Sequence, residues 1–206
     1  MTGIFKYGAA EISHLKAQDP CLGSLIECRG KIERQTNDDL FSSLVHSIVS
    51  QQISDKAAVT VWQRLQNEFG EITRESLAEA SEDRLIRCGI SARKARYIKD
   101  AATSSLDFDA LKKLPDETFI RTLSALSGVG VWTCEMLLIF CLARPDVVSF
   151  GDFGIKNGMK RLYGLTTLDK QTFLKYRKNY TPFGSVASFY LWELSNNPSL
   201  LDEMQP

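Results

Sequence analysis

Residues 123–133 read Leu123-Ser124-Ala125-Leu126-Ser127-Gly128-Val129-Gly130-Val131-Trp132-Thr133, a pattern that predicts a helix, a tight turn and a second helix. Gly128 and Gly130, separated by one residue, let the turn adopt positive φ and approach another molecule closely. The second helix begins with N–H groups that can receive a phosphate oxygen, and the Thr133 hydroxyl can add a donor. Many turns between packed helices share this pattern, so a purely structural turn is the alternative.

Helical spacing of apolar residues recurs along most of the chain and predicts an all-α protein. One helix follows a cap at Asn37 or Asp38, a second begins at Ser54 and ends near Gly70, and a third begins at Ser91. Further helices are expected at residues 115–126, 131–143, 152–163 and 184–194. The helix at 131–143 is apolar nearly all round, so we expect it to be central and buried. Sustained alternation of apolar and polar residues is scarce, so little or no sheet is expected.

Charge is unevenly distributed along a chain whose net charge is zero, with 25 cationic and 25 acidic residues in 206. Residues 84–99 hold six cations and no acid, and residues 152–180 hold seven cations and two acids. A basic surface on an otherwise acidic body is compatible with a polyanionic partner. Solvated helix faces would give the same count, so the two interpretations stay open.

Several classes of protein are disfavoured by simple counts. The longest apolar run, residues 136–143, is too short to span a bilayer, and the N-terminus lacks the pattern of a secretory signal. Five cysteines without a Cys-x-x-Cys motif argue against a disulfide framework or a structural zinc site. This cysteine usage fits a reducing cytoplasm.

Asp152 lies in the segment Ser149-Phe150-Gly151-Asp152-Phe153-Gly154-Ile155, where a helix is expected to begin. The simplest interpretation is a helix cap, since aspartate is favoured at that position.

Taken together, the hairpin, the apolar helix after it and the Phe-Gly-Asp-Phe-Gly-Ile segment resemble the helix-hairpin-helix superfamily of DNA glycosylases. The branch they resemble is that of 3-methyladenine DNA glycosylase II. Two more segments match it in order, Gln51-Gln52-Ile53-Ser54 and Gly89-Ile90-Ser91-Ala92-Arg93-Lys94-Ala95. The resemblance implies two helical domains, residues 36–144 and residues 1–35 with 145–206, and an active-site cleft between them.

The resemblance also implies roles for individual residues in extruding a damaged nucleotide and cleaving its glycosidic bond. Asp152 would be the catalyst, stabilising positive charge on the sugar and orienting the attacking water. Trp132 and Trp192 would form an aromatic base pocket, although each could equally be a core residue. The implied DNA contacts are Gln51, Gln52, Ile53, Ser91, Lys94, Gly128, Gly130 and Thr133. Among them, Gln52 and Ile53 would fill the space that the extruded nucleotide leaves; an ordinary polar loop is the alternative.

The resulting prediction is a glycosylase that excises alkylated purines, of the 3-methyladenine and 7-methylguanine type, from damaged double-stranded DNA in base excision repair. Bifunctional relatives carry a lysine where this chain has Trp132, so we expect a monofunctional enzyme. No iron–sulfur cluster is expected, because no cysteine follows Cys141. The resemblance allows a monovalent cation, Na+ or K+, on the backbone carbonyls of Ser124, Leu126 and Val129.

We further expect a monomer with no membrane partner, acting in the bacterial or archaeal nucleoid or in the eukaryotic nucleus. A non-catalytic helix-hairpin-helix DNA-binding protein and a glycosylase for another lesion are the alternatives. The family's usual proline is replaced by Ser127 at the start of the turn, which leaves the lesion preference open.

Overall fold

The computed structural model describes residues 2–204, and its contacts divide the chain into two compact units. One, the hairpin unit, comprises residues 37–137, and the other, the terminal unit, comprises residues 2–36 together with those from 138 onward. The second division falls at residue 137, inside the helix α10 (Val131–Phe140), rather than at residue 144 as the sequence suggested. A continuous helix shared by two units carries no local sequence signal of that division.

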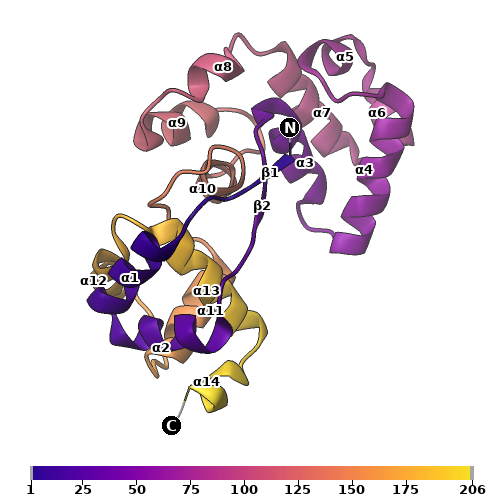
Figure 1. Cartoon of the computed structure of the whole chain (residues 1–206). Helices are drawn as coiled ribbons and strands as arrows, with labels where there is room; N and C mark the ends of the chain where they lie inside the picture. The colour runs from indigo at the N-terminus through magenta and orange to yellow at the C-terminus, as the bar shows by residue number, and fades with distance from the viewer. Residues whose placement is uncertain (1, 205–206) are drawn as a thin grey trace. The chain divides into compact units, whose positions relative to one another are not determined.

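The hairpin unit is built around α7, which contacts α3, α5 and α6 (Figure 1). Its apolar side, with Ala95, Ile98 and Ala102 buried, faces these neighbours. Before α10 the helices of this unit are α3 (Leu40–Ser50), α4 (Asp55–Phe69), α5 (Arg74–Glu79), α6 (Glu82–Arg87), α7 (Ala92–Thr103), α8 (Phe108–Leu111) and α9 (Asp116–Leu123).

The helix caps follow the sequence closely, with one exception. Ser54 and Ser91 accept backbone N–H groups at the starts of α4 and α7, and Gly70 ends α4 with a φ of 69°. The prediction of Asn37 or Asp38 as the cap of α3 is wrong, because Asp39 accepts the N–H of Ser42 at 3.0 Å. Asn37 instead belongs to the strand β2 (Gln35–Asn37).

The terminal unit is built around α13 (Gly184–Asn196), which packs against α11 (Phe153–Leu162) and α2 (Pro20–Arg29). Gly158 makes the approach to α11 possible, since a Cβ there would lie 2.1 Å from the Leu191 carbonyl oxygen. The remaining elements are β1 (Thr2–Ile4), α1 (Ala9–Gln18), α12 (Lys170–Arg177), the 3-10 helix η1 (Lys178–Tyr180) and α14 (Leu200–Glu203).

The all-α class is confirmed, and the only strands among residues 2–204 are the short pair β1 and β2 (Figure 1). The expectation that the helix at 131–143 is buried throughout is wrong at its start, where Val131 and Trp132 are exposed. Leu137, Leu138 and Ile139 further along are buried. No helix within residues 2–204 has the length and apolar character needed to cross a membrane.

Candidate active site

Asp152 is a buried carboxylate at the start of α11, held by two hydrogen bonds to one of its oxygens. Oδ1 accepts the backbone N–H of Ile155 at 2.8 Å and the indole N–H of Trp192 at 2.9 Å. The first bond is the helix cap expected from the sequence, and the N-terminal end of the helix favours the negative charge. The second bond, from a residue 40 positions later, fixes the carboxylate from another helix.

The Trp192 indole is held by neighbouring aromatic rings and by the space that a glycine leaves. Its ring is nearly parallel to Phe140, with centroids 5.6 Å apart, and to Phe189, with centroids 6.2 Å apart. Gly154 gives the indole room, since a Cβ there would lie 2.7 Å from Trp192 Cδ1. The sequence predicted Trp192 as a base-stacking residue, and it did not anticipate the bond to Asp152.

Phe153 is a residue that the sequence reasoning missed. It directly follows Asp152 and is 76% exposed, unusually open for a large aromatic side chain. A flat apolar ring kept in water beside a buried carboxylate is a suitable surface on which a base can stack. Its place in the Phe-Gly-Asp-Phe-Gly segment was the available signal.

The turn between α9 and α10 has the backbone that its glycines predict. Gly128 has a φ of 76°, and a Cβ on it would lie 2.1 Å from the ring of Tyr97. Gly130 is exposed, with open space where a Cβ would be, whereas Thr133 is buried. Gly128 and Gly130 are therefore exposed together with Ser127, and their bare backbone suits contact with a phosphate.

The loop after α3 carries the residues expected to enter DNA, and we call residues 51–53 the insertion loop. Gln52 has a φ of 57°, and Ile53 is 38% exposed at the loop. Gln51 instead donates its side-chain N–H to the Gly128 carbonyl at 2.9 Å, which joins this loop to the hairpin turn. Gln52 and Ile53 therefore keep the exposure that insertion requires, and Gln51 has a contact within the protein.

Trp132 lines a cavity of about 680 Å³ within the hairpin unit. The indole, on the first turn of α10, is 45% exposed. Gln51 and Gln52 line the same cavity, which places the insertion loop beside this tryptophan. The full lining is His46, Ser47, Ser50, Gln51, Gln52, Asp55, Ala58, Val59, Trp132 and Met136.

Comparison with known proteins identifies the family to which this chain belongs. Residues 45–182 match the HhH-GPD superfamily of base excision DNA repair proteins. This chain belongs to that superfamily. The DNA-3-methyladenine glycosylase 1 of Schizosaccharomyces pombe is 30% identical over 175 residues, covering 81% of this chain and 77% of the relative.

Two solved structures extend the likeness to the fold. A DNA-3-methyladenine glycosidase from Bacillus halodurans has a TM-score of 0.82 at 36% identity and covers 96% of this chain and 94% of its own. The 3-methyladenine DNA glycosylase Mag1 of Schizosaccharomyces pombe, in complex with abasic DNA, has a TM-score of 0.77 at 28% identity. That match covers 91% of this chain and 97% of Mag1.

The structure shows which cations of the basic segment at residues 84–99 have partners within the protein. Lys94 donates to two carbonyls at the end of α3, Lys99 donates to three carbonyls at the end of α5, and Arg84 pairs with Glu68 at 2.9 Å. Three of the six cations therefore have partners inside the protein. Counting charges along the sequence overstated the basic surface of this segment. Ser91, also expected at DNA, is the cap of α7.

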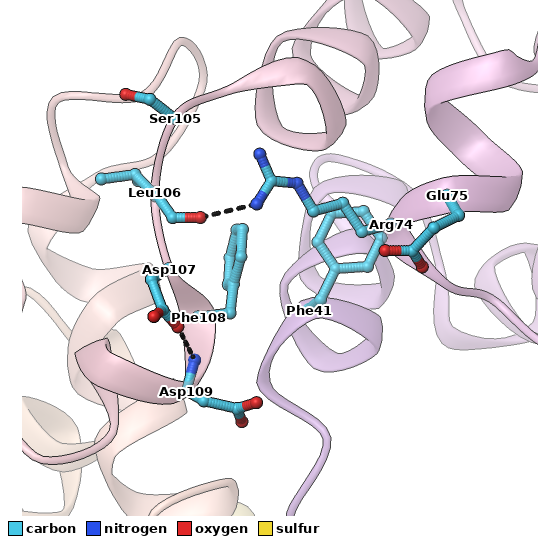
Figure 2. Close-up of a pocket in the computed structure, with 8 residues that line it drawn as sticks. All are labelled: Phe41, Arg74, Glu75, Ser105, Leu106, Asp107, Phe108 and Asp109. Atoms are coloured by element: carbon cyan, nitrogen blue, oxygen red, sulfur yellow. Dashed lines mark hydrogen bonds between the residues drawn. The ribbon is translucent and has the colours of Figure 1, made fainter.

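A second cavity of the hairpin unit, about 330 Å³ in volume, is lined by residues that bond to one another and stabilise the fold (Figure 2). Arg74 donates to the Leu106 carbonyl at 2.7 Å and to the Ala102 carbonyl at 2.9 Å. Asp107 accepts two N–H groups at the start of α8, and Phe41 meets Phe108 edge to face. These contacts secure the connection between α7 and α8, so this cavity is not part of the candidate site. Within the described residues no cluster of His, Cys, Asp or Glu could hold a metal ion.

Proposed function

We propose that this protein is a monofunctional DNA glycosylase that removes alkylated purines from duplex DNA in base excision repair. The observation that carries the proposal is the buried Asp152 carboxylate, oriented by the Ile155 N–H and the Trp192 indole. A capping aspartate requires only the first of these bonds. The names of the relatives, 3-methyladenine glycosylase from Schizosaccharomyces pombe and 3-methyladenine glycosidase from Bacillus halodurans, support the substrate class.

Extrusion of the damaged nucleotide is the first step of the proposed reaction. Rotating a nucleotide out of the stack costs a few kcal/mol, and the cost is lowest for a damaged or mispaired base. Ile53 would wedge apolar bulk into the vacated space, and Gln52 would hydrogen-bond the orphaned base. The backbone of Gly128 and Gly130 would hold the phosphates without reading the sequence.

Cleavage then requires stabilisation of positive charge on the sugar. The bond between C1′ and the purine nitrogen breaks, and its electron pair leaves with the base, which neutralises the charge of a cationic methylated purine. Asp152 would stabilise the oxocarbenium-like sugar and orient the water whose oxygen bonds to C1′. A proton of that water passes to the carboxylate and then to solvent. The product is an intact abasic site.

Recognition of the lesion would rest on aromatic surfaces. Base stacking contributes about 1–3 kcal/mol per base, and a positively charged ring gains about 2 kcal/mol more by cation–π attraction when desolvated. Trp132 and Phe153 expose rings that can provide these contacts. Trp192 would serve mainly to hold Asp152, because its ring is stacked on Phe140 and Phe189.

The proposal excludes lyase chemistry through a Schiff base at position 132, because tryptophan has no amine. Lys156, the next candidate amine in sequence near Asp152, lies over the Phe150 ring at 5.1 Å. Borohydride treatment during turnover would leave no covalent DNA adduct, whereas a trapped adduct would contradict the monofunctional assignment.

A cation on the Ser124, Leu126 and Val129 carbonyls stays a prediction; the Leu126 carbonyl already accepts the Val129 N–H at 3.2 Å. The protein would act in the nucleoid or nucleus, where its substrate lies.

The proposal is tested by incubating the protein with duplex DNA carrying 3-methyladenine or 7-methylguanine. We expect release of the free methylated base and strand breaks that appear only after alkali treatment. Tight binding to the same duplex without base release would instead indicate a non-catalytic DNA-binding protein. Release of a different damaged base from a panel of lesions would move the assignment to another lesion class.

A further inference from the structure

Lys94 is a half-buried residue of α7 whose ammonium reaches the end of α3. Its ammonium donates to the carbonyl oxygens of Val49 at 2.7 Å and Gln51 at 2.6 Å. The last carbonyls of a helix have no partner within the helix, and a cation there satisfies them and favours the helix dipole. Burial, with a smaller contribution from Arg93, lowers the pKa of Lys94, in keeping with this position inside the protein.

Tyr97, three residues after Lys94 on α7, supports the hairpin turn. The ring of Tyr97 fills the space beside Gly128, where any Cβ would lie 2.1 Å from it. The Gly128 carbonyl in turn accepts the side-chain N–H of Gln51 at 2.9 Å. One helix therefore contacts the insertion loop through Lys94 and the hairpin through Tyr97, and Gln51 closes the connection between loop and hairpin.

The insertion loop needs such support because its own conformation is unfavourable. Gln52 adopts a positive φ that residues other than glycine rarely take, and Ile53 exposes apolar surface to water. At the end of α3, the Gln51 N–H meets the Ile48 carbonyl at 3.4 Å. The Lys94 ammonium supplies two shorter bonds at the same place.

We propose that Lys94 is a positioning residue. It holds the insertion loop in the conformation that enters DNA and fixes the loop's position relative to the hairpin turn. This inference rests on the proposed function for its consequence in base excision. It differs from the role that the sequence suggested, in which Lys94 would contact DNA directly. The two roles predict different effects of removing the ammonium.

The test compares Lys94→Met with two matched variants. Lys94→Met keeps the length of the side chain and loses the donors. Lys99→Met, on the same helix, loses three comparable bonds to the Leu77, Ala78 and Ala80 carbonyls at the end of α5. Arg93→Met removes one exposed charge from the neighbouring position. Lys99→Met therefore controls for lost stability and Arg93→Met for lost charge.

The first measurement is amide hydrogen exchange in the protein without DNA, which does not depend on any activity. We expect Lys94→Met to accelerate exchange at least tenfold in residues 49–53 and in the turn at 127–130, and Lys99→Met to accelerate it near residues 77–80 instead. Unchanged exchange in residues 49–53 of Lys94→Met would overturn the proposal. If Lys94→Met does not fold, Lys94→Gln, which keeps one amide donor, is measured with the same two outcomes.

The second measurement separates positioning from phosphate contact. We expect Lys94→Met to lose at least tenfold in single-turnover rate on a fully paired lesion and to recover most of it on a bulged lesion, where extrusion costs less. Its affinity for undamaged DNA and the salt dependence of that affinity should match Arg93→Met or wild type. Equal rate losses on both lesions, with a shallower salt dependence, would identify a phosphate contact and refute positioning. Failure of the wild-type protein to release any base would reject the proposed function alone, because the exchange result stands apart from it.

Discussion

Replacing Trp192 with phenylalanine isolates one bond at the candidate catalytic carboxylate. Phenylalanine keeps an aromatic ring beside Phe140 and Phe189, and it removes the indole N–H that bonds to Asp152 Oδ1 at 2.9 Å. The cap from the Ile155 N–H at 2.8 Å remains. The substitution therefore loosens the orientation of Asp152 without removing its charge or its helix position.

The size of the effect follows from the kind of bond lost. A hydrogen bond to a charged group contributes about 1.5–3 kcal/mol, and each ~1.4 kcal/mol lost from transition-state stabilisation slows a reaction about tenfold. If the bond acts mainly by orienting the carboxylate, Trp192→Phe should reduce the single-turnover excision rate by about 10- to 100-fold. The free energy of unfolding should fall by about 1–3 kcal/mol, since the buried carboxylate loses a donor.

The assay pairs single-turnover release of 7-methylguanine at saturating enzyme with fluorescence anisotropy on the same lesion duplex. Trp62→Phe is the matched control, because Trp62 lies edge to face on His46 in the hairpin unit, whereas Asp152 belongs to the terminal unit. We expect the rate to fall for Trp192→Phe alone, with lesion affinity close to wild type. A wild-type rate would refute the reasoning, and so would a loss of affinity at an unchanged rate, which would make Trp192 a base-stacking residue instead.

Two further predictions concern the support of the fold. Gly128→Ala should lower the melting temperature, because alanine at a φ of 76° costs about 1–2 kcal/mol and its Cβ displaces the Tyr97 ring. Gly130→Ala, with open space at its Cβ, should leave the melting temperature nearly unchanged. Equal melting temperatures for the two variants would contradict this prediction. Burial would raise the pKa of Glu193, but hydrogen bonds from Arg34 and Arg29 outweigh burial and hold that pKa below its usual value of 4.5. The ion pairs therefore contribute stability, about 0.5–1 kcal/mol, that is complete above the unfolded pKa and lost as the pH falls through the folded pKa. In urea unfolding at pH 7 and pH 3, Glu193→Gln should cost stability only at pH 7, and an equal cost at both values would contradict the assignment.

Local sequence signals predicted the parts of the fold that depend on neighbouring residues. Ser54, Ser91 and Gly70 bound their helices as expected, because a cap bonds to backbone only a few residues away. The two strands of three residues were too short to show alternation. The cap at Asp39 was missed because Asn37 and Asp38 carry the same chemical signal as Asp39.

Contacts between distant segments were beyond local sequence signals. Nothing around Lys94 shows that its ammonium meets the Val49 carbonyl, so it counted as a surface charge. The bond from Trp192 to Asp152 joins residues 40 positions apart, and it became visible only when α13 was placed against α11. Resemblance to the superfamily named Asp152 and Trp192 separately, whereas the fold shows that one positions the other.

The most direct test of the account is the single-turnover rate of Asp152→Asn on a duplex containing 7-methylguanine. Asparagine is a good helix cap, and its side-chain oxygen can accept the same two N–H groups, so the change removes the charge and little else. A carboxylate about 4 Å from a developing positive charge contributes about 4 kcal/mol at an effective dielectric constant of about 20. The account predicts a rate about a thousandfold below wild type with lesion binding retained. A wild-type rate of base release from Asp152→Asn would contradict it.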